Sequence, residues 1–145
     1  MMQTDETDQA LLDLLADNAR APVATLARRL GLARTTVQAR LDRLESSGVI
    51  EGYTLRLADR LRAPLRATAL VSIEPRSAPA VLARLRSLPD VRTVHTTSGR
   101  FDLIVGIEAA TTEALDDTLD RIGETRGVKG SESLIQLSTK LDRRA

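Results

Sequence analysis

The chain has 145 residues, of which 42% are hydrophobic and 28% charged, and its formal net charge of +1 is typical of a folded globular protein rather than a disordered one. Aromatic residues make up only 1% and cysteine is absent, which argues against base stacking on single strands and excludes disulfides, thiolate catalysis and sulfur-ligated zinc. The acidic start, followed by no long apolar stretch, predicts neither a signal peptide nor a membrane span, so we expect a cytoplasmic protein.

The first part of the sequence has the apolar periodicity of helices. Apolar residues recur at helical spacing over residues 8–19, with Thr4 or Asp5 available as the N-cap. Pro22 then begins a short second helix, and Gly31 ends it because glycine readily takes the left-handed conformation found at helix C-termini. Two helices are therefore expected in this stretch.

A third helix is predicted over residues 34–46, with apolar residues along one face. Short helices joined by a tight glycine turn make a helix-turn-helix. The β-rich stretch 49–57 that follows is expected to form a strand or small wing. The pattern therefore predicts a winged helix-turn-helix domain over residues 1–57.

The outward face of the third helix is rich in side chains that read or contact DNA. Glutamine can pair with adenine and arginine with guanine, threonine can meet a base edge or a thymine methyl group, and flanking arginines neutralise phosphates. Residues 18–62 contain nine arginines against four acidic residues, a local basic excess. The alternative is a small helical bundle whose arginines are merely solvated. The predicted DNA-binding residues are Arg28, Arg29, Arg34, Thr35, Thr36, Gln38, Arg40 and Arg43.

After a predicted linker at residues 58–65, the apolar period changes from that of a helix to that of a strand. Alternation predicts strands over residues 66–74, 91–97, 101–107 and 133–139, and helices that begin at Ser77 and at Thr111 or Thr112. The order βαββαβ closes naturally as a ferredoxin-like domain over residues 66–145. The fold class is therefore α+β.

Several linked motifs follow one another along the chain. They are DQALL at 8–12, NAR at 18–20, LARRLGL at 26–32, VQARLDRLE at 37–45, GVIEGY at 48–53, HTTSGRFD at 95–102 and GV at 127–128. Together they resemble the Lrp/AsnC (leucine-responsive, feast-famine) family of transcription regulators. Where the family often has a serine that caps each helix of the motif, this chain has Pro22 and Ala33. The resemblance implies a homo-oligomer, with dimers assembling to a tetramer or octamer, and an amino acid bound where the C-terminal domains meet.

A free amino acid needs an anion for its ammonium group and convergent donors for its carboxylate. The turn before the third strand offers the Asp102 carboxylate together with backbone N–H groups in a glycine turn. The candidate effector-binding residues are Ser98, Gly99, Arg100, Phe101 and Asp102, with Ser131 and Ser133 added by the resemblance alone. The alternative is an ordinary hairpin turn. We expect no cofactor beyond this effector.

Other classes of protein find little support in the sequence. His95, the only histidine, has no cysteine, histidine or acidic partner at ligand spacing, so no metal site is predicted. No phosphate loop or defensible carboxylate pair suggests a metabolic enzyme, and the basic helix-turn-helix disfavours a module that only binds an amino acid and assembles. We therefore predict a sequence-specific regulator that binds double-stranded DNA and is not an enzyme.

Overall fold

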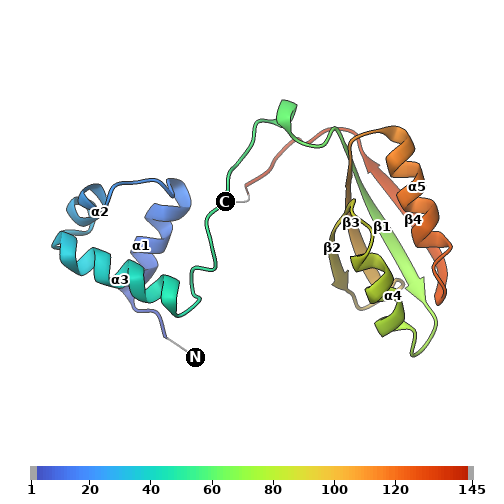
Figure 1. Ribbon diagram of the computed structural model, residues 1–145, viewed down its shortest axis with the longest axis horizontal. Coiled ribbons are helices and arrows are strands. Elements are labelled where there is room, and N and C mark those ends of the chain that lie inside the picture. The colour runs from blue at the N-terminus through green and yellow to red at the C-terminus, as the bar shows by residue number, and fades with distance from the viewer. Residues whose placement is uncertain (1–2, 144–145) are drawn as a thin grey trace. The chain divides into compact units, whose positions relative to one another are not determined.

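The computed structural model describes residues 3–143. The chain divides into two compact units, the first ending at Arg56 and the second spanning Leu57–Asp142 (Figure 1). The elements in order are α1 (Glu6–Asp17), α2 (Val23–Leu30), α3 (Arg34–Ser46), the short 3-10 helix η1 (Asp59–Leu61), β1 (Leu65–Ile73), α4 (Ala78–Arg86), β2 (Val91–Thr96), β3 (Leu103–Ala109), α5 (Thr112–Gly123) and β4 (Val128–Gln136). The α+β class and the βαββαβ order are confirmed.

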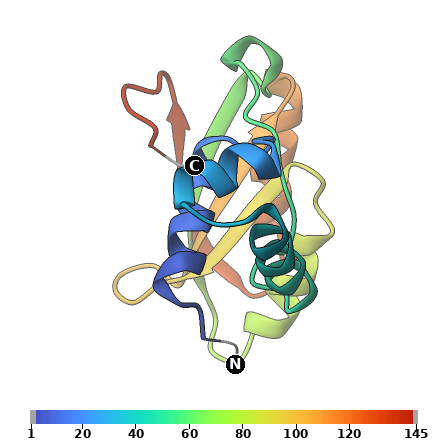
Figure 2. The same cartoon turned by 90° about the vertical axis from the view of Figure 1, so that its left-hand side faces the viewer.

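Three helices make the first unit, which Figure 2 shows from the side. The side chain of Asp5 caps α1 by accepting from the N–H of Asp8 at 2.7 Å. Gly31 ends α2 in the left-handed region, with φ of 66°, and so permits the tight turn into α3. One apolar face of each helix is buried, and the core consists of Leu11, Leu15, Leu26, Ala27, Val37, Leu41 and Leu44.

The predicted strand or wing over residues 49–57 is wrong. After α3 the chain is irregular, without a strand until β1. At the start of this stretch the N–H of Ile50 bonds to the carbonyl of Leu44 at 2.9 Å, which closes the end of α3 rather than a ladder. A β-rich sequence forms a strand only where another strand pairs with it, and no strand of the described chain does so here.

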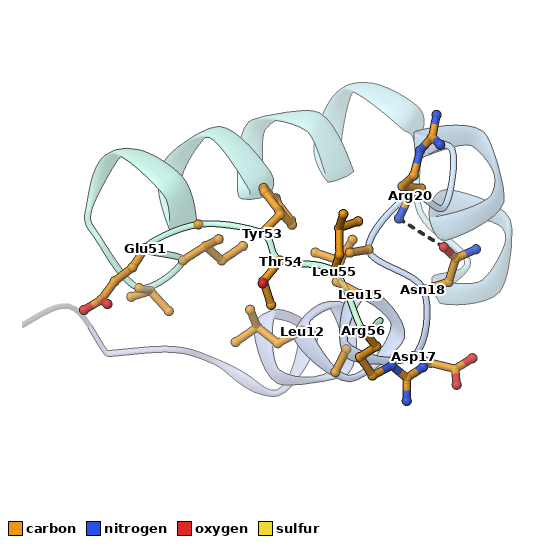
Figure 3. A pocket seen from close by; sticks show the side chains of 15 residues that line it. Leu12, Leu15, Asp17, Asn18, Arg20, Glu51, Tyr53, Thr54, Leu55 and Arg56 are labelled. Atoms are coloured by element: carbon orange, nitrogen blue, oxygen red, sulfur yellow. Dashed lines mark hydrogen bonds between the residues drawn. The ribbon is translucent and has the colours of Figure 1, made fainter. Parts of the chain in front are cut away.

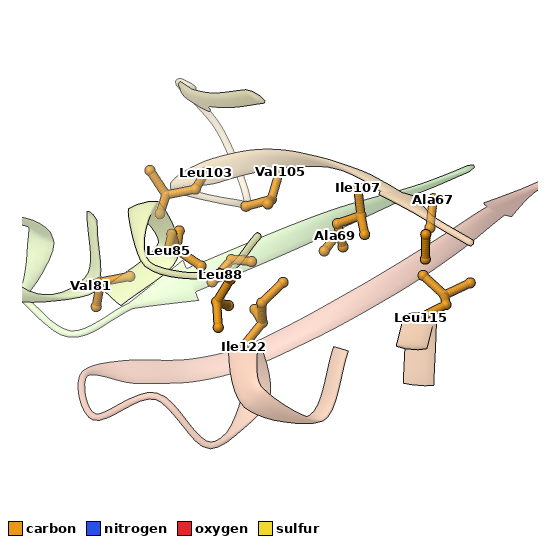
Figure 4. Packing of buried hydrophobic residues seen from close by; sticks show 12 residues of the cluster. Ala67, Ala69, Val81, Leu85, Leu88, Leu103, Val105, Ile107, Leu115 and Ile122 are labelled. Carbon is orange, nitrogen blue, oxygen red and sulfur yellow. The ribbon is translucent and has the colours of Figure 1, made fainter. Parts of the chain in front are cut away.

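The second unit is a four-stranded antiparallel sheet with the strand order β2-β3-β1-β4. Successive side chains of a strand point to opposite faces of the sheet. Alternate residues of β1 and β3 therefore point toward α4 and α5, and these residues are apolar and buried (Figure 4). This core consists of Ala67, Ala69, Val71, Val81, Leu85, Leu88, Leu103, Val105, Ile107, Ala109, Leu115 and Ile122. Both helices thus cover one face of the sheet.

The last strand begins and ends earlier than the sequence suggested. β4 spans Val128–Gln136 rather than residues 133–139. Its limits follow from its partner, because Val128 lies opposite Ile73 and Gln136 opposite Arg66 at the two ends of β1. Most of β4 is exposed, so its burial shows no alternation that would reveal these limits.

Gly127, which precedes β4, has a φ of +99°, and a Cβ placed on it would lie 2.6 Å from Cβ of Ser77 and 3.1 Å from Cγ2 of Val81. Gly127→Ala is therefore expected to lower the free energy of unfolding of the second unit by about 2–3 kcal/mol. Urea denaturation followed by circular dichroism measures this loss. Gly130→Ala is the control, because a Cβ there has open space. Equal stability of the two variants would contradict the steric argument.

Candidate functional site

The exposed face of α3 presents three of the predicted DNA-reading side chains. Thr35, Thr36 and Gln38 are all exposed, whereas Val37 between them is fully buried. The side-chain amide of Gln38 donates to Oδ1 of Asp42 at 2.8 Å, one turn further along. A shallow hollow of about 480 Å³ lies on this face, lined by Thr35, Thr36, Ala39, Arg40 and Arg43.

Three of the predicted phosphate-contacting arginines border this face without an ionic partner. Arg28 and Arg29 lie in the last turn of α2, and Arg34 is the first residue of α3. All three are exposed, and within residues 3–143 none of them forms an ion pair. Their full charge is therefore available to a polyanion.

The other two predicted arginines form ion pairs with aspartates at the start of the first unit. Nη1 of Arg40 lies 2.8 Å from Oδ2 of Asp5 and 2.8 Å from Oδ1 of Asp8. Nη2 of Arg43 lies 2.8 Å from Oδ2 of Asp8. Sequence reasoning did not identify either aspartate as an ionic partner of these arginines, although residues 3–17 contain five acidic side chains and no basic one.

Neither helix of the motif has a capping side chain. Pro22 before α2 and Ala33 before α3 make no side-chain hydrogen bond to the helix that follows. The first backbone N–H groups of α3 therefore have no side-chain cap. An unpaired helix N-terminus favours anions such as phosphate.

The turn between β2 and β3 is fastened to β1. Oγ1 of Thr97 donates to the carbonyl of Phe101 at 2.6 Å, and the N–H of Asp102 donates to the carbonyl of Val71 at 2.9 Å. The carboxylate of Asp102 accepts from the N–H of Ile73 through Oδ2 at 2.8 Å. One carboxylate oxygen of Asp102 therefore holds the turn to β1. Asp102 is an exposed residue, so its other oxygen, Oδ1, is accessible from solvent.

Ser131 and Ser133 do not join this turn. They lie opposite Val71 and Ala69, so their side chains point to the helix-covered face of the sheet. Glu132 points to the other face, and its Oε1 accepts from Nη2 of Arg100 at 3.2 Å. Glu132 was not among the predicted residues, because only the strand register reveals which of these neighbours faces the turn.

Arg100 also contacts the ring of its neighbour. Its guanidinium carbon lies 4.9 Å from the centre of the Phe101 ring, a cation–π distance. Gly99 between the strands has a φ of +118°, which suits glycine alone among the turn residues. The predicted turn residues 98–102 therefore form one ordered group, but Phe101 and Asp102 lie before β3 rather than in it.

A groove of about 620 Å³ separates the end of α1 from the irregular segment 49–56 (Figure 3). Leu12 and Leu15 line one wall, and Tyr53 and Leu55 of the irregular segment line the other. The hydroxyl of Tyr53 donates to Glu45 of α3 at 2.8 Å and so ties the segment to the first unit.

The part of the chain that the structure describes has neither a candidate metal site nor a membrane-spanning helix. Among residues 3–143, no three histidine or acidic side chains converge in a way that could hold a metal ion. No helix of the same residues combines the length and the apolar character needed to cross a bilayer.

Comparison with known proteins decides the family. Residues 4–51 match the winged helix-turn-helix DNA-binding model, and residues 66–145 match the Lrp/AsnC ligand binding domain. The chain belongs to the Lrp/AsnC family. It is therefore a DNA-binding transcription regulator with a ligand-binding domain, and the expectation that it is not an enzyme is confirmed.

Named relatives of this Lrp/AsnC regulator match nearly its whole length. The regulator LrpA of Mycobacterium tuberculosis is 34% identical over 136 residues, covering 90% of this chain and 89% of LrpA. The regulator FL11 of Pyrococcus horikoshii is 31% identical, covering 93% and 90%. The structure of the regulator NMB0573 from Neisseria meningitidis in complex with L-Met matches with a TM-score of 0.86 at 24% identity, covering 97% of this chain and 94% of that one.

Proposed function

We propose that α3 of this regulator enters the major groove, where its outward side chains meet base edges, namely those of Thr35, Thr36, Gln38 and Arg43. The arginines around them contact phosphates, namely Arg28, Arg29, Arg34 and Arg40. The proposal is supported by a difference between two groups of arginines, of which one is free of ion pairs among the described residues and the other is bound to aspartates. Arg28, Arg29 and Arg34 are exposed and form no ion pair with any residue that the structure describes, and they lie beside the exposed face of α3, where a phosphate backbone would run. Arg40 and Arg43 lie along the same face, with part of each guanidinium held by α1.

The proposal is tested on a duplex that the full chain selects from a randomised pool. The logarithm of the association constant should fall linearly with the logarithm of salt concentration, because each neutralised phosphate releases counterions. A scrambled duplex of equal length measures non-specific binding. Failure to bind any duplex in a salt-dependent way would overturn the proposal.

Arg29→Ala is expected to weaken binding to the selected and the scrambled duplex by the same factor, and to flatten the salt slope by about one unit. A phosphate contact stabilises every sequence equally, which is the reason for this uniform loss. The matched control is Arg60→Ala, which removes the same charge from η1, outside the three helices. A loss confined to the selected duplex would instead make Arg29 a base-reading residue.

We further propose that the ligand is a free amino acid and that it binds at the turn formed by residues 98–102. Asp102 offers a carboxylate oxygen for an ammonium group, and the glycine turn offers N–H groups for a carboxylate. The bound L-Met of the Neisseria relative supports this class of ligand. Ser131 and Ser133 could contribute only from the other face of β4, near α5.

We also propose that the regulator is a homo-oligomer, a dimer that assembles to a tetramer or octamer, and that it acts in the cytoplasm. Two exposed features support self-assembly. The segment 49–57 has the composition of a strand but pairs with no strand among residues 3–143, and it exposes Leu55 and Leu57. The sheet face opposite the helices includes Leu134, which is 57% exposed. Light scattering on the full chain measures the assembly.

A further inference from the structure

A compact ionic cluster joins the start of α1 to the middle of α3. Asp5 and Asp8 form a reciprocal capping box, in which each side chain accepts from the backbone N–H of the other, at 2.7 and 3.2 Å. The same two carboxylates also bind Arg40 and Arg43, which lie on adjacent turns of α3. One pair of side chains thus both starts α1 and fixes α3.

Asp8 is the centre of this cluster. It is 1% exposed, and its two oxygens accept from the N–H of Asp5, from Arg40 and from Arg43. A buried carboxylate is tolerated only when it is paired and hydrogen-bonded in this way. Burial by itself raises the pKa of Asp8, but the hydrogen bonds from Arg40 and Asp5 and the charge of Arg43 outweigh it and hold the pKa below the ordinary value.

The two arginines differ in how much of each remains free. The side chain of Arg40 is 24% exposed and is shared between both aspartates. The side chain of Arg43 is 50% exposed, and among residues 3–143 only its Nη2 has a bonding partner, Asp8. The guanidinium of Arg43 therefore has its other N–H groups free, on the wall of the hollow that also contains Thr36 and Ala39.

The rotation of α3 depends on such directional contacts. The helix has no capping side chain at Ala33, and its buried residues are aliphatic, so they resist rotation through shape alone. Charge-assisted hydrogen bonds are short and directional, and a carboxylate that holds arginines from two turns of one helix fixes which face of the helix points outward.

We propose that Asp8 is a positioning residue for sequence recognition, which holds the guanidinium of Arg43 and the outer face of α3 in the orientation that reads the operator. The inference rests on α3 being the helix that enters the groove. Asp8 also neutralises an arginine charge that would otherwise attract any duplex. It therefore favours specific over non-specific binding.

The test compares Asp8→Asn with Asp13→Asn in the full chain. Both variants remove one negative charge from α1, but within the described part of the chain Asp13 accepts only from Gln9 on its own helix. Asp8→Asn should reduce the ratio of selected to scrambled duplex affinity at least about tenfold, because the operator loses an oriented arginine. It should also steepen the salt slope on the scrambled duplex by about 0.9 as a guanidinium is freed. Asp13→Asn should leave the ratio unchanged.

The outcomes separate this inference from the proposed function. If the wild-type chain binds no duplex, the assignment of α3 fails first. If the wild type binds but Asp8→Asn and Asp13→Asn give the same ratio, Asp8 acts only through its charge and the inference is wrong.

A second variant keeps the test decisive if Asp8→Asn does not fold by circular dichroism. Arg43→Lys retains the charge but lacks the branched donors that reach Asp8 and a base together. It should lower the same ratio while leaving scrambled-duplex affinity within about twofold. A ratio equal to that of the wild type would overturn the inference.

Discussion

Gln38→Ala should weaken binding to the selected operator duplex about 5- to 150-fold, equivalent to about 1–3 kcal/mol, and leave scrambled-duplex affinity unchanged. Gln38 is exposed on α3, and its amide donates to Asp42. That bond is solvent-exposed, so exchanging it for a bidentate pair with adenine costs little. Fluorescence anisotropy with both duplexes measures the two affinities.

The chain provides a closely matched control for this substitution. Gln9 on α1 donates to Asp13 four residues further on at 3.0 Å, the same exposed arrangement that joins Gln38 to Asp42. Gln9→Ala therefore removes an equivalent helix-surface bond away from the predicted groove face. If both variants bind the operator like the wild type, α3 does not read bases through Gln38.

The helices of the first unit could be predicted because their signals are local. Gly31 must adopt positive φ to end α2, and Asp5 must accept a backbone hydrogen bond to start α1, so each residue type marks its own position. The strand predicted over residues 49–57 was wrong for the opposite reason. A strand is defined by its partner, and residue preference alone does not supply one.

The same distinction explains what was missed at the sites. The outer face of α3 follows from helical geometry once Val37 is buried, so the exposure of Thr35, Thr36 and Gln38 could be predicted, while their role in reading DNA stays a prediction. The bonds from Arg40 and Arg43 to Asp8 join residues more than thirty positions apart and depend on how two helices pack. Sequence periodicity contains no information about such a contact.

The turn before β3 could be predicted only in part from the sequence. The glycine turn and Asp102 were recognised as a candidate ligand site, and the structure holds both in one ordered group. The partner of Arg100 on β4 was not foreseen. Because β1 lies between β3 and β4, the register of two strand pairs decides that Glu132 rather than Ser131 faces the turn.

Asp102→Asn should reduce affinity for the amino-acid ligand at least about tenfold, because the ammonium group loses a charge-assisted hydrogen bond. The asparagine keeps one side-chain oxygen, which can still accept from the N–H of Ile73, so the turn should remain fastened to β1. Calorimetric titration of the common amino acids into the wild type and the variant measures the loss.

The variant should bind the operator duplex as the wild type does, yet lose any ligand-dependent change in oligomer size or footprint, since a ligand acts only through its different affinities for the states it connects. Asp116→Asn is the control, because it removes the same charge from the exposed surface of α5. Light scattering with and without the ligand follows the assembly. If Asp102→Asn binds the wild-type ligand with equal affinity, the ammonium is held elsewhere, and the carboxylate serves only the backbone of Ile73. If the wild type binds no amino acid, the proposed ligand class is wrong, whatever the geometry of the turn.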